Sequence, residues 1–262
     1  MSTEQIFYLI IFITYSLVGI LITYNATKVK KTNVYYFGFN LIVNGFIYFV
    51  VFLEFTYMQY IVRGFSLVLG LLFTQYTFYQ DKKGPFKFFL TFAIISGCIQ
   101  GVLSILAFFS PFSLLIAVPS LYLADIFFAV TVMINAGWFT HAAFEAYKGV
   151  KSFNLEPFQK KRYIIFAVSG LFLIFVGFLF FILMPVLINY MLNPTPVNYV
   201  IQLIVQFSIA GFTIVFIILN YLVWVPPKFF RNFLNKGYQG STEKEEELSE
   251  EELMKKLSSG GS

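Results

Sequence analysis

Residues Phe112 to Lys148 read FSLLIAVPSLYLADIFFAVTVMINAGWFTHAAFEAYK, and this stretch decides how the rest of the chain is interpreted. It is apolar for most of its length, yet it contains the carboxylate of Asp125. A run of about 20 apolar residues is long enough to cross a bilayer as a helix. A charge inside such a run is costly, so it marks either a functional site or a structural ion pair.

The composition extends this interpretation to the whole chain. Of the 262 residues, 58% are hydrophobic, 21% are aromatic and only 12% are charged, whereas soluble domains carry about 25% charged residues. The lone cysteine, Cys98, excludes an intramolecular disulfide and a thiolate metal cluster. We therefore expect an integral, multi-pass protein of the cell membrane, with the lipid bilayer as its first partner.

Seven apolar stretches predict an all-α, seven-helix bundle. The expected spans cover approximately residues 6–24, 34–54, 58–79, 86–109, 112–148, 163–188 and 198–225. Lysine and arginine occur in alternate connections, at residues 28–31, 82–87, 148–162 and 228–236. Because basic loops stay on the cytoplasmic side, we expect the N-terminus outside and the C-terminus inside. Topology thus explains the net charge of +5, and nucleic acid is not an expected partner.

The chain divides into three expected parts. Residues 1–227 form the transmembrane domain, and residues 228–236, with phenylalanines beside cations, form a short interfacial amphipathic helix. Residues 237–262 form an acidic, mostly disordered cytoplasmic tail, because they are rich in glutamate and poor in apolar residues. The final residues, Ser258 to Ser262, resemble an engineered linker.

Polar residues inside the spans fall on shared helix faces. Arg63, Ser66 and Gly70 recur at steps of three and four in the third span, and a polar stripe in the seventh span consists of Gln202, Gln206, Thr213 and Asn220. We therefore expect the second, third, fifth and seventh spans to face inward together. The sixth span has almost no polar residue and is expected to be more exposed to lipid.

The two deep charges lie at similar depth in their spans, Arg63 near the outer end of the third and Asp125 in the outer half of the fifth. Pairing would ease the desolvation of both side chains. One alternative is a purely structural ion pair. The other is a ligand or ion site, to which Ser66, Gln202 and Gln206 would contribute.

Other candidate groups lie elsewhere on these spans. His141 and Glu145 are one helical turn apart, but about 24 Å along the axis separates His141 from Asp125. We expect His141 and Trp138 to lie at the inner interface, with no metal bound. The fourth span carries a face of small residues suited to close packing or homo-oligomer formation. That face comprises Ala93, Gly97, Gly101 and Ser104.

Catalytic signatures are absent from the sequence. It has no glycine-rich phosphate loop, no His-Glu-x-x-His and no serine nucleophile motif. A single histidine cannot build the zinc site of seven-helix membrane hydrolases, and the seventh span has no lysine that could hold retinal. We therefore expect no enzyme, no catalytic residues and no cofactor.

The order of elements resembles that of seven-transmembrane receptors, including G-protein-coupled receptors, and that of microbial seven-helix sensors. The segment Phe230-Arg231-Asn232-Phe233 resembles the Phe-Arg-x-x-Phe of the receptors' eighth helix, with one residue fewer before the second phenylalanine. The receptor motifs Asn-Pro-x-x-Tyr and Cys-Trp-x-Pro are missing, so the resemblance is one of topology.

That resemblance implies a receptor or sensor that binds an unknown small ligand or ion and signals to a cytoplasmic protein partner. Two alternatives are open. One is an ion or proton channel or transporter that uses the intramembrane polar stripes, and the other is a structural or assembly protein of the membrane.

Overall fold

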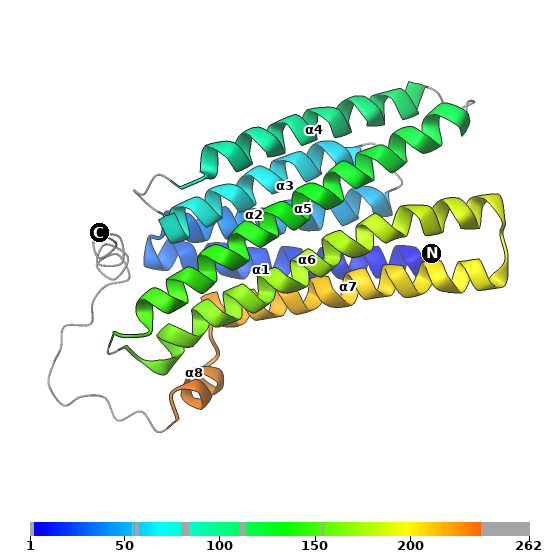
Figure 1. Ribbon diagram of the computed structural model, residues 1–262. Helices are drawn as coiled ribbons and strands as arrows, with labels where there is room; N and C mark the ends of the chain where they lie inside the picture. The colour runs from blue at the N-terminus through cyan, green and yellow to red at the C-terminus, as the bar shows by residue number, and fades with distance from the viewer. Residues whose placement is uncertain are drawn as a thin grey trace, which may run out of the picture.

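The computed structural model describes residues 3–53, 55, 58–79, 84–109, 114–153 and 155–236, and over these ranges the chain is helical with no strand (Figure 1). The helices are α1 (Thr3–Val29), α2 (Thr32–Phe52), α3 (Met58–Thr74), α4 (Phe86–Phe109), α5 (Leu114–Val150), α6 (Pro157–Leu192), α7 (Pro196–Trp224) and α8 (Lys228–Leu234). A π-helical turn, η1 (Gln75–Tyr79), continues α3. The expected acidic tail lies outside the described residues.

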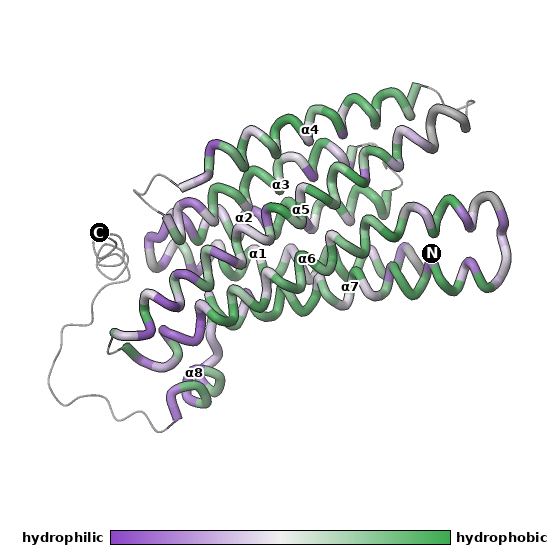
Figure 2. The backbone as a smooth tube through the Cα atoms, in the orientation of Figure 1, coloured by the Kyte–Doolittle hydropathy of each residue, from purple (hydrophilic) through white to green (hydrophobic). Residues whose placement is uncertain are grey.

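Seven of these helices are long and apolar enough to cross a membrane, which confirms the predicted number of spans and supports a multi-pass membrane protein. They run alternately up and down, so that the N-terminus and the α6–α7 turn lie at one end of the bundle and α8 at the other (Figure 1). Figure 2 shows hydrophilic residues gathered at the end that carries α8 and hydrophobic residues along the middle of the long helices.

Proline and threonine set several helix ends. Thr195 is the N-cap of α7, where its hydroxyl accepts a hydrogen bond from the backbone N–H of Asn198 at 3.2 Å. Pro196 follows in the first turn, where its missing N–H costs nothing. Pro226 and Pro227 end α7, because proline cannot donate the backbone hydrogen bond that would continue the helix. At the start of α6, Pro157 plays the same part as Pro196 and places the helix start six residues before the expected one.

Close packing of α1 on α2 depends on glycine. A methyl group added to Gly38 would lie 2.9 Å from the backbone nitrogen of Thr23 in α1, which is too close for a carbon atom. Small residues let two helices approach in this way, and in lipid such packing is a main source of helix association. The α1–α2 pair therefore forms one wall of the bundle.

The interior of the bundle is aromatic. The ring of Phe73 in α3 lies 4.6 Å from that of Phe37, 5.9 Å from that of Phe139 and 6.2 Å from that of Phe166, measured between centroids. Trp224 of α7 joins the same cluster at 6.0 Å. These rings come from five helices and fill the half of the bundle toward the end that carries α8.

The placement of two helices bears on the expected exposure to lipid. Helix α4 lies at the edge of the bundle, where it packs on α3 and α5 (Figure 1). Helix α6 packs between α5 and α7 and turns apolar side chains inward. The expectation that α6 is the more lipid-exposed helix is confirmed, because its span has the smallest share of buried residues among the seven, although one of its faces borders the interior.

Trp138 was expected in the aromatic belt at the membrane interface, but it is buried inside the protein. Only 4% of its surface is exposed, and its indole N–H donates to the hydroxyl of Tyr79 at 3.1 Å. Its ring stacks on that of Phe89 in α4 at 4.7 Å. Trp138 therefore joins α3, α4 and α5 inside the protein, since its N–H finds a partner in the π-helical turn.

Candidate functional site

A cavity of about 410 Å³ lies inside the bundle and is bordered by six helices, α1, α2, α3, α5, α6 and α7. Its walls are mostly apolar, and its lining begins in the first turns of α1, at Phe7 and Tyr8, and reaches the middle of the bundle. Ligand pockets are usually concave, apolar spaces of about 300–1,000 Å³ with a few placed polar groups. The size and lining of this cavity fall in that class.

The predicted ion pair forms, and it stands in the wall of the cavity. Nη1 of Arg63 lies 2.5 Å from Oδ1 of Asp125, with 6% of the arginine and 7% of the aspartate exposed. Nη2 of Arg63 donates to Oε1 of Gln59, one turn earlier in α3, at 3.0 Å. Two helices are thereby held together by groups that would be costly to bury separately.

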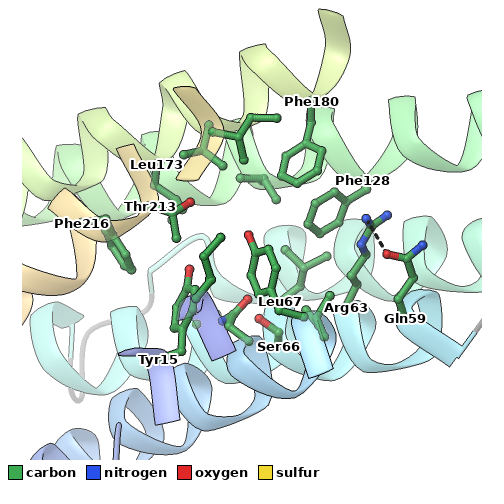
Figure 3. A pocket seen from close by; sticks show the side chains of 18 of the residues that line it. Tyr15, Gln59, Arg63, Ser66, Leu67, Phe128, Leu173, Phe180, Thr213 and Phe216 are labelled. Atoms are coloured by element: carbon green, nitrogen blue, oxygen red, sulfur yellow. Dashed lines mark hydrogen bonds between the residues drawn. The ribbon is translucent and has the colours of Figure 1, made fainter. Parts of the chain in front are cut away.

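Aromatic rings surround the guanidinium group. Its carbon lies 4.3 Å from the ring centroid of Phe128, 4.9 Å from that of Tyr60 and 5.6 Å from that of Phe180. The Tyr60 hydroxyl also donates to Oδ2 of Asp125 at 3.3 Å. Aromatic faces attract cations, most strongly away from water, so these rings replace part of the hydration that Arg63 has lost. Figure 3 shows Arg63 beside Gln59 and the ring of Phe128.

Among the described residues of the cavity wall, two groups have buried polar atoms without a hydrogen-bond partner. One is Nε of Arg63, and the other is the whole side-chain amide of Asn135 in α5. A guanidinium group has five N–H donors, and an amide has two donors and one acceptor oxygen. Leaving such atoms unpaired in an apolar interior costs about 1–3 kcal/mol each. The cavity is where a partner for both groups could lie.

The polar side chains on the α2 side of the cavity are already paired. The Asn40 amide donates to the backbone oxygen of Ser66 at 2.5 Å, and the Asn44 amide donates to Oδ1 of Asn40 at 2.8 Å. The rings of Tyr15 and Tyr48 stack beside them at 5.8 Å between centroids. The buried polar atoms without a partner lie instead on α3 and α5.

A floor of phenylalanine rings ends the cavity toward α8. Phe37, Phe73, Phe139 and Phe216 line it there and belong to the aromatic cluster that fills the rest of the bundle. In Figure 3, Phe216 and Arg63 lie at opposite ends of the view. Asn220, one turn beyond Phe216, is buried below this floor and donates to the Phe216 carbonyl at 2.8 Å. The polar stripe expected on α7 is thus divided by the floor.

Most of the site residues expected from the sequence border the same cavity. Arg63, Ser66, Asp125 and Gln206 all line it. Gln202 is buried one turn from Gln206 but is not among the lining residues. A helical repeat of three to four residues places both glutamines on one side of α7, but it does not show how far the cavity extends along that side.

Several important members of the site were not predicted. Phe128, Phe180 and Tyr60 are aromatic residues in an aromatic-rich chain, and nothing in the sequence distinguishes those around Arg63 from the others. Gln59 had a signal, because it lies four residues before Arg63 and so on the same face of α3. Asn135 also had one, as a lone amide in a long apolar stretch of α5.

The small-residue face of α4 packs partly inside the bundle. Ala93 and Ser104 are buried, and a methyl group added to Gly97 would lie 3.9 Å from the Cα atom of Gly64 in α3. At Gly101 the same addition would meet nothing within 4 Å. Helix α4 is further held by the Ser96 hydroxyl, which lies 2.6 Å from that of Thr131 in α5. The hydrogen bond between α4 and α5 was not predicted.

His141 is exposed on α5, away from the cavity, and Glu145 pairs with Lys148 at 2.8 Å on the same surface. Over the ranges that the structure describes, no three His, Cys, Asp or Glu side chains gather closely enough to hold a metal ion.

No protein-family model, no curated protein and no solved structure matches this chain.

Proposed function

We propose that the protein is a receptor or sensor of the cell membrane that binds a small, mostly apolar molecule in the cavity and signals to a cytoplasmic partner at the end of the bundle that carries α8. The observation that carries this proposal is the 410 Å³ cavity, whose wall holds a buried ion pair and unpartnered polar atoms. A mostly apolar pocket with a few convergent polar groups is the usual form of a small-molecule site.

Helix α6 is suited to carry the signal. A bound molecule would touch this helix directly, because the cavity is bordered by its residues Leu173, Val176, Phe180, Leu183 and Leu187. At its other end, Glu156 accepts hydrogen bonds from Arg231 of α8 at 2.9 and 3.0 Å and from Asn235 at 3.1 Å. Shifts of a packed helix by 1–2 Å are a common form of switching, and such a shift of α6 would move α8 with it.

The distribution of basic residues supports the direction of this signal. Lys28, Lys148, Lys160 and Arg231 all belong to the end of the bundle that carries α8. Basic residues flank transmembrane helices preferentially on the cytoplasmic side. The cavity would then face the outside half of the membrane and α8 the cytoplasm.

A channel or transporter is the second class of function that the polar stripes suggested. The phenylalanine floor argues against a continuous polar pathway, because it separates Gln206 and Thr213 above from Asn220 below. We therefore expect no proton or cation flux through the protein in liposomes. Flux that Asp125→Asn abolishes would favour the channel over the receptor.

Binding can be tested although the natural ligand is not identified. The protein in nanodiscs would be screened by native mass spectrometry against a panel of small amphiphilic molecules. The informative variant is Val176→Trp, which fills the cavity from α6, and its matched control is Val102→Trp on the exposed outer face of α4. We expect molecules that bind the wild type and the control but not Val176→Trp. A panel without a binder, or binding equal in both variants, would contradict the proposal.

A further inference from the structure

The two unpartnered groups of the cavity lie at different depths. Arg63 of α3 is paired with Asp125 of α5. Asn135 lies ten residues after Asp125 on α5. At 1.5 Å per residue, the ion pair and the amide are about 15 Å apart along the helix axis. Both belong to the lining of the same cavity. An occupant that satisfied both would have to be elongated.

The space between the two groups is apolar on its α5 and α6 side, and on the opposite side the polar residues Asn40 and Ser66 already bond each other. On α5 it is bordered by Phe128 and Val132, and on the facing helix α6 by Leu173 and Val176. Polar atoms placed there would lose their bonds to water without gaining a partner, at a cost of about 1–3 kcal/mol each. The middle of the occupant is therefore hydrocarbon.

The charge at the Arg63 end is already balanced. Among the described residues that line the cavity, only Arg63 and Asp125 are charged, and they are paired with each other. An anionic ligand would add a second negative charge close to Asp125 in an interior where an uncompensated charge is very costly. The free Nε–H of Arg63 is instead matched by a neutral oxygen, from an alcohol, an ether or a carbonyl.

The amide of Asn135 can both donate and accept. A hydroxyl group also donates and accepts, so it can form a hydrogen bond with either the nitrogen or the oxygen of the amide. We propose that the ligand is an uncharged, elongated amphiphile with a hydrocarbon middle, one oxygen that accepts from Arg63 and a second polar group, such as a hydroxyl, that bonds Asn135. This inference deepens the proposed function and rests on it, because it assumes that the cavity is a ligand site.

Three probes of similar chain length separate the parts of the proposal: dodecanediol with a hydroxyl at each end, dodecanol with one, and laurate with a carboxylate. Binding of each radiolabelled probe would be measured at pH 8 on protein in nanodiscs, with empty nanodiscs subtracted. We expect dodecanediol to bind about 3- to 10-fold more tightly than dodecanol, which is the effect of one added hydrogen bond. We expect laurate to bind at least about tenfold more weakly than dodecanol.

The matched variants are Asn135→Leu, which removes the unpartnered amide, and Asn189→Leu, an exposed position of α6 outside the cavity. The advantage of dodecanediol over dodecanol should disappear in Asn135→Leu and persist in Asn189→Leu. Laurate binding as tightly as dodecanol would overturn the uncharged ligand, a result that needs no variant. A dodecanediol advantage that is absent in the wild type, or that survives Asn135→Leu, would overturn the second contact.

Failure of this inference can be told apart from failure of the receptor proposal. If none of the three probes binds but the wider panel yields a molecule that Val176→Trp excludes, the cavity is a ligand site for another chemistry. If neither the probes nor the panel binds, both proposals fall.

Discussion

Replacement of Asp125 by leucine would leave the buried guanidinium of Arg63 without a counterion. Removal of one partner of a buried pair costs about 3–5 kcal/mol, because the remaining charge is then uncompensated. Arg63 would keep its hydrogen bond to Gln59 at 3.0 Å and its contacts with the rings of Phe128 and Tyr60. Each such ring contact is worth about 0.5–2 kcal/mol. We therefore expect a loss near the lower limit, about 3 kcal/mol.

The double variant Arg63→Met/Asp125→Leu decides whether this loss comes from the charge. Replacing a whole buried pair by apolar residues of similar volume is often neutral or stabilising, by about 1–4 kcal/mol. Here the Tyr60 hydroxyl would lose its bond to Asp125, which at 3.3 Å is long and worth about 0.6–2 kcal/mol. The double variant should thus be more stable than Asp125→Leu by at least about 1 kcal/mol.

Reversible unfolding in mixed micelles, titrated with dodecyl sulfate, measures these differences. The control is Glu145→Leu, because the pair of Glu145 with Lys148 is half exposed and its loss should change the stability little. Two results would refute the reasoning: Asp125→Leu within about 1 kcal/mol of the wild type, or a double variant no more stable than that single one. Either would mean that Arg63 does not depend on Asp125 for its compensation.

Two further predictions concern the frame of the bundle. Gly38→Ala should destabilise the protein by about 1–3 kcal/mol in the same titration, because its methyl group collides with Thr23; Gly101→Ala, where space is open, should be neutral, and equal effects would contradict the packing of α1 on α2. Glu156→Ala should loosen the contact of α8 with α6, since Glu156 bonds both Arg231 and Asn235 and, among the hydrogen bonds of the described residues there, only that from the Phe158 N–H to Asn235 would remain. Hydrogen exchange should then rise in residues 228–234 and stay unchanged in α7; unchanged exchange in α8 would show that other contacts hold it.

The sequence by itself determined the number of spans and their approximate ends. These are local properties, because a membrane requires about 20 apolar residues in each helix and proline or charged residues mark the turns. It also indicated that Arg63 and Asp125 belong together, since two opposite charges at similar depth have no other compensation in their spans. The faces of α3 and α7 followed from helical periodicity.

Only the tertiary structure decided which apolar faces meet and which face lipid. In lipid, an apolar side chain gains little by choosing protein over hydrocarbon, so the sequence of α6 could not show that Leu173 and Val176 border a cavity. The cavity itself is built by six helices, and its floor depends on rings that come from α2, α3, α5 and α7. The unpartnered state of Asn135 likewise follows from what surrounds it in space, because an amide in a helix can find a partner on any neighbouring helix.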